Sequence, residues 1–290
     1  MSTEPALLAA IAASPDDDLP RLVYADWLDE NGRHLRAEFI RLQIEIARKE
    51  TLPRAAVNVF SHLWKRQQEI LDDHRDELLG PLTGVVGWHE AEFRRGFLND
   101  ITLSAELFGT HGEAVARLVP LPERVEVTYA ADWFALFQLN ADWLNAVTHL
   151  RMSSRDDDIP DLTDPEDIPM MREACGWLRL RSLDLENCQY GADLPDLFAA
   201  PCFPALADLD LSFNDLTDAG VTALLNTGVP QRLKRLVLGG NPIGDQAAME
   251  LADRLGGSTV LENLNLRMTD IGPAGQAALL ARLGGKMDLF

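Results

Sequence analysis

Residues 206–216 read LADLDLSFNDL, and this stretch decides the fold of the chain. Its leucines fall at the first, fourth and sixth positions, the spacing of a short strand with one buried face. The pattern returns as LKRLVLGGNPI at 233–243 and LENLNLRMTDI at 261–271, and its first part appears as LRSLDLENC at 180–188. The four stretches begin at 180, 206, 233 and 261, so successive starts are 26, 27 and 28 residues apart.

A helical stretch follows each of the last three strand stretches. Residues 217–225, 245–255 and 275–283 carry apolar residues at helical spacing, and glycine pairs close the last two. One strand and one helix every 26 to 28 residues resemble the leucine-rich repeat of the ribonuclease-inhibitor type. The resemblance implies an α/β solenoid, with parallel strands on its concave side and helices on its convex side.

The residue that follows each strand should tie one coil to the next. Asn214 and Asn241 are expected to turn inward and hydrogen-bond the backbone where the chain leaves the strand. Cys188 stands at the same position as an accepted alternative, and Thr269 departs from the pattern.

Weaker matches extend the predicted repeat domain to residues 81–290, with clear repeats at 171–290 and degenerate coils at 81–170. Strand cores are expected at 100–103, 124–127 and 147–152, and helices at 105–118 and 133–144. Residues 153–169 are acidic and contain prolines, so we expect a solvated insert there. The prediction is an array of roughly seven coils.

Residues 1–80 form a separate all-helical module in this prediction, with helices at 4–13, 19–30, 36–48 and 60–79. The stretch DDLPRLVYADWLDENG at 17–32, followed by RAEFIRLQ at 36–43, resembles the repeat-companion domain, which precedes the repeats in many bacterial leucine-rich repeat proteins. The resemblance covers residues 2–48 and departs at 33–35, where the family has a short Gly-Asp-Pro-like turn. That family implies no catalytic residue.

The same module holds a conspicuous group of aromatic and charged residues: Tyr24, Asp26, Trp27, Glu38 and Arg41. One interpretation is a peptide-recognition site, with an aromatic platform beside charged groups. The other is structural, with an ion pair between Asp26 and Arg41, or between Glu38 and an arginine, that joins two helices. The sequence leaves both open.

The composition limits the partners. The formal net charge is −20, from 26 basic and 46 acidic residues, so a general basic surface for nucleic acid is disfavoured and a basic protein partner is favoured. Cys175, Cys188 and Cys202 lack the spacing of a disulfide framework or a zinc site. No apolar run is long enough to span a membrane, and no basic segment precedes 6–13, so we expect a cytoplasmic protein.

Catalytic motifs are incomplete throughout the sequence. His89 and Glu90 make half of a zinc-protease motif, but Phe93 stands where its second histidine would be. The GGNPIG stretch at 239–244 has the wrong order for a dinucleotide loop, and the acidic run at 156–158 has the wrong order for a calcium loop. We therefore expect no catalytic residue, cofactor or metal.

The concave face is the expected binding site. The third, fifth and seventh positions of each strand stretch alternate away from the buried leucines. Neighbouring strands lie about 4.8 Å apart, so the acids of adjacent coils repel one another by about 1 kcal/mol per pair, and a cationic partner would relieve that repulsion. The predicted partner-binding residues are Asp184, Glu186, Asp208, Asp210, Arg235, Asn265 and Arg267.

The predicted function is therefore a non-catalytic scaffold for a protein partner. Three alternatives stay open: a solvated acidic face without a partner, a structural subunit that oligomerises through its N-terminal helices, and an enzyme with its site in the N-terminal module. The sequence does not give the oligomeric state.

Overall fold

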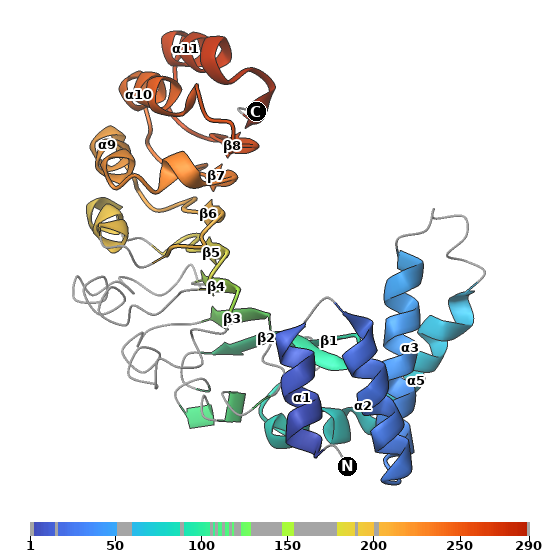
Figure 1. Ribbon diagram of the computed structural model, residues 1–290. Helices are drawn as coiled ribbons and strands as arrows, with labels where there is room; N and C mark the ends of the chain where they lie inside the picture. The colour runs from blue at the N-terminus through green and yellow to red at the C-terminus, as the bar shows by residue number, and fades with distance from the viewer. Residues whose placement is uncertain are drawn as a thin grey trace. The chain divides into compact units, whose positions relative to one another are not determined.

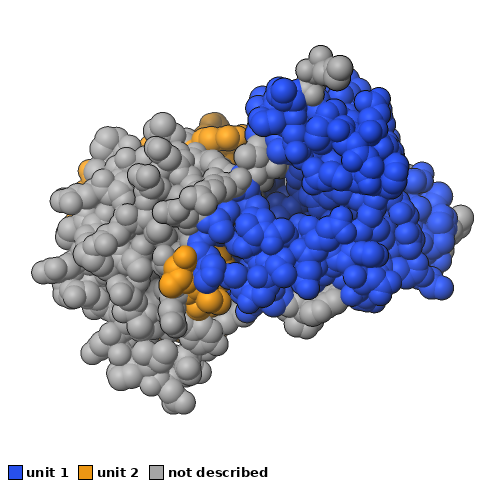
Figure 2. All heavy atoms as spheres, turned by 90° about the horizontal axis from the view of Figure 1, so that it is seen from below, with its two compact units in different colours: residues 1–102, 111–123 blue, residues 103–110, 124–290 orange. Residues whose placement is uncertain are grey.

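The computed structural model describes residues 3–14, 17–50, 60–87, 90–104, 107, 110–111, 114–115, 118, 123–128, 147–153, 179–188, 191–199 and 203–288. The chain divides into two compact units (Figure 2). Unit 1 comprises Met1–Thr102 and His111–Glu123, and unit 2 comprises Leu103–Thr110 and Arg124–Phe290. The domain boundary after residue 80 stays a prediction.

Unit 1 contains the four expected N-terminal helices. They are α1 (Glu4–Ala13), α2 (Asp18–Glu30), α3 (His34–Glu50) and α5 (Ser61–Leu79), and a short 3-10 helix, η2 (Gly80–Leu82), follows α5. Helix α2 begins where it does because the Asp17 carboxylate accepts the backbone N–H of Leu19 at 2.9 Å.

A β-hairpin follows the helices, in the segment where the sequence analysis expected degenerate coils. Strand β1 (Ala91–Arg94) pairs antiparallel with β2 (Phe97–Ser104), whose middle was expected to be the strand of a degenerate coil. Arg95 at φ +50° and Gly96 at φ +85° make the two-residue turn.

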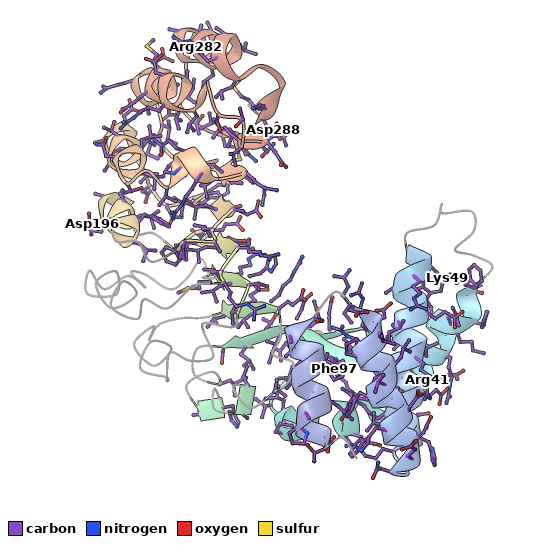
Figure 3. All side chains as sticks on the ribbon, viewed as in Figure 1. Arg41, Lys49, Phe97, Asp196, Arg282 and Asp288 are labelled. Carbon is purple, nitrogen blue, oxygen red and sulfur yellow. The ribbon has the colours of Figure 1, made fainter. Side chains whose placement is uncertain are left out.

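Gln43 of α3 attaches this hairpin to the helices. Its side-chain oxygen accepts the N–H of Gly96 at 2.7 Å, and its side-chain nitrogen donates to the carbonyl of Phe93 at 3.1 Å. Phe97 then enters a core built by α1, α2 and α3 (Figure 3). The guanidinium groups of Arg21 and Arg36 lie 5.9 and 5.3 Å from the centre of its ring.

Unit 2 is the predicted leucine-rich repeat solenoid. Its strands pair in parallel and in chain order, and helices cover the side opposite to them (Figure 1). The strands are β3 (Arg124–Thr128), β4 (His149–Ser153), β5 (Ser182–Asp184), β6 (Asp208–Asp210), β7 (Arg235–Val237), β8 (Asn263–Asn265) and β9 (Met287–Asp288). The helical segments are η4 (Gly191–Phe198), α9 (Asp218–Asn226), η5 (Pro230–Arg232), α10 (Asp245–Leu255), α11 (Pro273–Leu283) and η6 (Gly284–Lys286).

Leucine stacking explains this architecture. Leu183, Leu209, Leu236 and Leu264 occupy one row across β5 to β8, and none is more than 1% exposed. The residues beside them on the strands point to the other face, as the alternating burial shows. Each coil thus completes the core of its neighbour.

The asparagine ladder is also present. The side-chain nitrogen of Asn241 donates to the carbonyl of Leu211 in the preceding coil at 2.9 Å. Its side-chain oxygen accepts the N–H groups of Asn214 and Leu216, both at 2.9 Å. Asn214 donates to the carbonyl of Leu185 at 2.7 Å in the same way. Both asparagines are buried, as expected.

Cys188 and Thr269 occupy the ladder position in the flanking coils. The Cys188 thiol donates to the carbonyl of Met152 at 3.2 Å, so it still reaches the preceding coil. The Thr269 hydroxyl donates to Leu266 of its own coil at 2.8 Å. The departure at Thr269 therefore removes this side-chain link between coils.

A second set of links joins the helices. An oxygen of Asp218 accepts the N–H of Gly244 at 2.6 Å, and an oxygen of Asp245 accepts the N–H of Gly275 at 2.9 Å. Each carboxylate therefore extends from the start of one helix to the start of the next. The aligned position in α11 is Pro273, which has no carboxylate.

Several expectations lie outside the described residues. These are the helix at 133–144, most of the helix at 105–118, and the acidic insert at 153–169 apart from Ser153, which ends β4. Cys175, Cys202 and His89 also lie outside them.

Candidate protein-binding face

The strand register assembles the columns of the concave face. Arg151, Asp184, Asp210, Val237 and Asn265 stand at successive fifth positions. The third positions read His149, Ser182, Asp208, Arg235 and Asn263. Strand β3 adds Arg124 and Glu126, and β9 adds Asp288, three face positions that the sequence analysis did not include.

Arg151 is a cation that the predicted site left out, although its column was recognisable from the sequence. Its guanidinium lies 2.8 Å from a carboxylate oxygen of Glu186, 3.4 Å from Asp184 and 4.0 Å from Glu126. The repulsion expected between the acids of β5 and β6 is thus partly relieved within the chain.

Asp184 lies at the centre of this charge arrangement. One of its oxygens accepts the N–H of Glu186 at 3.0 Å, and its side chain is 26% exposed. Burial, with a smaller contribution from the negative charge of Asp210, raises the pKa of Asp184 to about 6, although the Glu186 N–H and the Arg151 charge oppose the change. Asp184 therefore changes its charge near neutral pH.

The two aspartates of β6 differ in their partners. An oxygen of Asp210 accepts both the N–H and the O–H of Ser212, at 3.0 and 2.5 Å, and its other oxygen lies 3.9 Å from Arg235. Asp208 stands between Ser182 and Arg235 in the register. Within the described part of the chain, no cation lies within ion-pair distance of Asp208.

The C-terminal coils present a more balanced surface. Arg267 donates to a carboxylate oxygen of Asp288 at 2.8 Å, and Figure 3 shows Asp288 at the strand side of the last coil. The side-chain oxygen of Asn265 accepts the N–H of Arg267 at 2.9 Å. Arg235 and Arg267 keep about half of their side chains exposed, so the predicted face is acidic on β5 and β6 and mixed beyond them.

Both ion pairs considered for the N-terminal module are present. Arg41 donates to Asp26 at 2.7 Å and to Asp29 at 2.6 Å, which joins α3 to α2. Glu38 accepts two hydrogen bonds from Arg66 of α5, at 2.7 and 2.9 Å. These pairs favour the structural interpretation, although their exposed side chains make each pair only a weak contributor to stability.

Tyr24 also makes structural contacts within the helical module. Its hydroxyl donates to Glu4 of α1 at 2.6 Å, and Arg33 donates to the same oxygen at 2.6 Å. Its ring stacks on Trp27, with 5.9 Å between the centroids. Glu4, Asp29 and Arg66 were missing from the group recognised in the sequence. For Asp29, the spacing of one helical turn from Asp26 was the available signal.

Within the described ranges, no group of three or more His, Cys, Asp or Glu side chains is placed to hold a metal ion. Cys188 is a free, buried thiol, and burial raises its pKa. The helices that are described include none with the length and apolar character needed to cross a membrane.

A family model agrees with the repeat assignment. The family model described as "Leucine Rich repeat" matches residues 206–225 and 230–252, so the chain contains leucine-rich repeats. Among solved structures, a crystal structure of a Bacteroides fragilis protein, a structural-genomics target, covers 67% of this chain and 74% of its own, with 15% identity and a TM-score of 0.38. No curated protein matches the chain.

Proposed function

We propose that this protein is a non-catalytic interaction scaffold that binds a basic protein segment on the concave face of its repeats. Leucine-rich repeats generally present such a face to protein partners. The observation that carries the proposal is the excess of carboxylates on β5 and β6. Asp184, Glu186, Asp208 and Asp210 face the arginines Arg151 and Arg235, which leaves two negative charges in excess.

A lysine or arginine from a partner would add attraction where the chain is short of positive charge. Asp208 is the most available of the four acids because it has no ion-pair partner in the described part of the chain. The net charge of −20 would also speed the approach of a basic partner at low ionic strength.

We also propose that residues 2–48 form a repeat-companion domain. We propose a cytoplasmic location for the protein. The ion pairs that join α2, α3 and α5 favour a structural role for the helical module. Its half-exposed groups have structural partners, which is the reason for preferring a scaffold to an enzyme with a site there.

Fluorescence anisotropy with the labelled peptide KRKSKRK tests the proposal. The face variant carries Asp184→Asn, Glu186→Gln, Asp208→Asn and Asp210→Asn. We expect about a tenfold loss of affinity, which corresponds to about 1.4 kcal/mol.

The matched control removes four exposed acids outside the face: Asp193→Asn, Asp196→Asn, Asp253→Asn and Glu262→Gln. It has the same net charge as the face variant, so a general effect of charge would weaken both equally. Equal losses in the two variants, or no loss in either, contradict binding at the face.

A further inference from the structure

The residue before each ladder position adopts a left-handed backbone in four successive coils. Asn187, Phe213 and Met268 have φ of +56°, +56° and +55°, and Gly240 has +66°. We call these four residues the exit-turn row. Glycine and asparagine suit this backbone, whereas a bulky side chain there costs of order 1 kcal/mol.

Packing within the protein does not account for both bulky residues. Met268 is 77% exposed and Phe213 is 41% exposed. The ring of Phe213 lies over Gly240, where an added Cβ would come within 2.4 Å of it. Gly240 therefore leaves room for Phe213, but Met268 gains little burial in return. Backbone strain that internal packing does not explain is a reason to look for a function at that position.

The charges around this row point to the partner. Asp215 and Asp270 stand two residues beyond Phe213 and Met268, and both are exposed. Across the part of the chain that is described, neither takes part in an ion pair, and the same is true of Asp208. The apolar row is therefore bordered by carboxylates whose charge the chain does not neutralise.

The spacing suits a single side chain. Phe213 and Met268 are two coils apart, so their backbones are separated by about 10 Å. Gly240 lies between them and has no side chain of its own. The Phe213 ring covers Gly240 and is itself 41% exposed. A leucine, methionine or aromatic side chain of a partner can therefore rest on the exposed side of this ring and contact Met268.

We propose that the exit-turn row extends the concave face as an apolar subsite, and that the partner is a basic segment carrying one large apolar side chain. That side chain packs between the exposed side of the Phe213 ring and Met268, while flanking lysines or arginines meet Asp208, Asp215 and Asp270. The inference rests on the proposed function, because it names the partner of the same surface.

Two labelled peptides test it on the full chain: KRKLKRK and KRKSKRK. The wild type should bind the leucine peptide about tenfold more tightly, since burying one leucine contributes that order of affinity. The double variant Phe213→Asn with Met268→Asn should bind both peptides as the wild type binds the serine peptide. Its melting temperature should equal or exceed that of the wild type, because asparagine tolerates the left-handed backbone.

The outcomes separate this inference from the proposed function. Equal binding of the two peptides by the wild type overturns the apolar subsite alone, and so does a leucine preference that survives in the double variant. If the wild type binds neither peptide, both ideas fail. Loss of binding in the face variant, with the leucine preference lost in the double variant, supports both.

Discussion

Asp184 makes the stability of the solenoid depend on pH. Its pKa is about 6 in the folded protein, against an ordinary value of 3.8. A carboxyl whose pKa rises on folding binds its proton more tightly in the native state. Its favourable contribution is complete below about pH 4 and is lost as the pH rises through 6.

We expect Asp184→Asn to be more stable than the wild type at pH 7.5, by about 1–2 kcal/mol, because the amide cannot ionise. The advantage should shrink towards zero near pH 4, where Asp184 is protonated as well. Urea denaturation of both proteins across this range measures it. A variant that is less stable at pH 7.5 would show that the contact with Arg151 outweighs the burial of the charge.

At the scale of elements, the β1–β2 hairpin depends on one glycine. A Cβ at Gly96 would lie 2.4 Å from Cγ1 and 2.6 Å from Cα of Ile40, so α3 leaves no space for it. We expect Gly96→Ala to cost about 3 kcal/mol or more, from this collision and from the positive φ.

Gly84→Ala is the matched control for that measurement. Gly84 has φ of +77° and nothing within 4 Å of an added Cβ, so only the backbone cost of about 1 kcal/mol applies. Chemical denaturation of the two variants separates the collision from the backbone effect. Equal losses would contradict the close approach of the hairpin to α3.

The elements that could be predicted are those whose signal is local. Strands β5 to β8 and helices α9 to α11 follow from leucine spacing, since every coil buries the same positions. The β1–β2 hairpin is different because Gln43 holds its turn from more than fifty residues away. Strand β9 has only two residues, too few to show any periodicity.

The candidate site likewise has parts that could be predicted from the sequence and parts that could not. Its columns were predictable because strand positions alternate, but the contacts made by Arg151 were not. They require knowing which carboxylates stand within reach across neighbouring strands. The exit-turn row was hidden for another reason: the sequence does not reveal that Phe213 and Met268 have left-handed backbones.

At the scale of the whole molecule, the ladder adds buried side-chain hydrogen bonds to the backbone hydrogen bonds that already join neighbouring coils. Asn241→Ala would leave the N–H groups of Asn214 and Leu216 and the carbonyl of Leu211 without these buried partners. We expect a loss of about 2–4 kcal/mol, together with faster amide exchange in both adjoining coils.

Thr269→Ala is the comparison, because the Thr269 hydroxyl bonds only within its own coil. Its removal should cost about 1 kcal/mol and change exchange only locally. If the two variants behave alike in urea denaturation and hydrogen exchange, the ladder does not couple neighbouring coils.

The carboxylate links between helices have a consequence for engineering. The coil that contains Asp245 can be inserted or copied as a module because it makes both kinds of link. The Asp245 carboxylate accepts an N–H of the following coil, and the N–H of Gly244 donates to the carboxylate of the preceding coil. The coil that contains Pro273 donates an N–H to the preceding coil but has no carboxylate at this position for a following one. Lengthening the array by duplication should therefore copy the first of these two coils and leave the second where it stands.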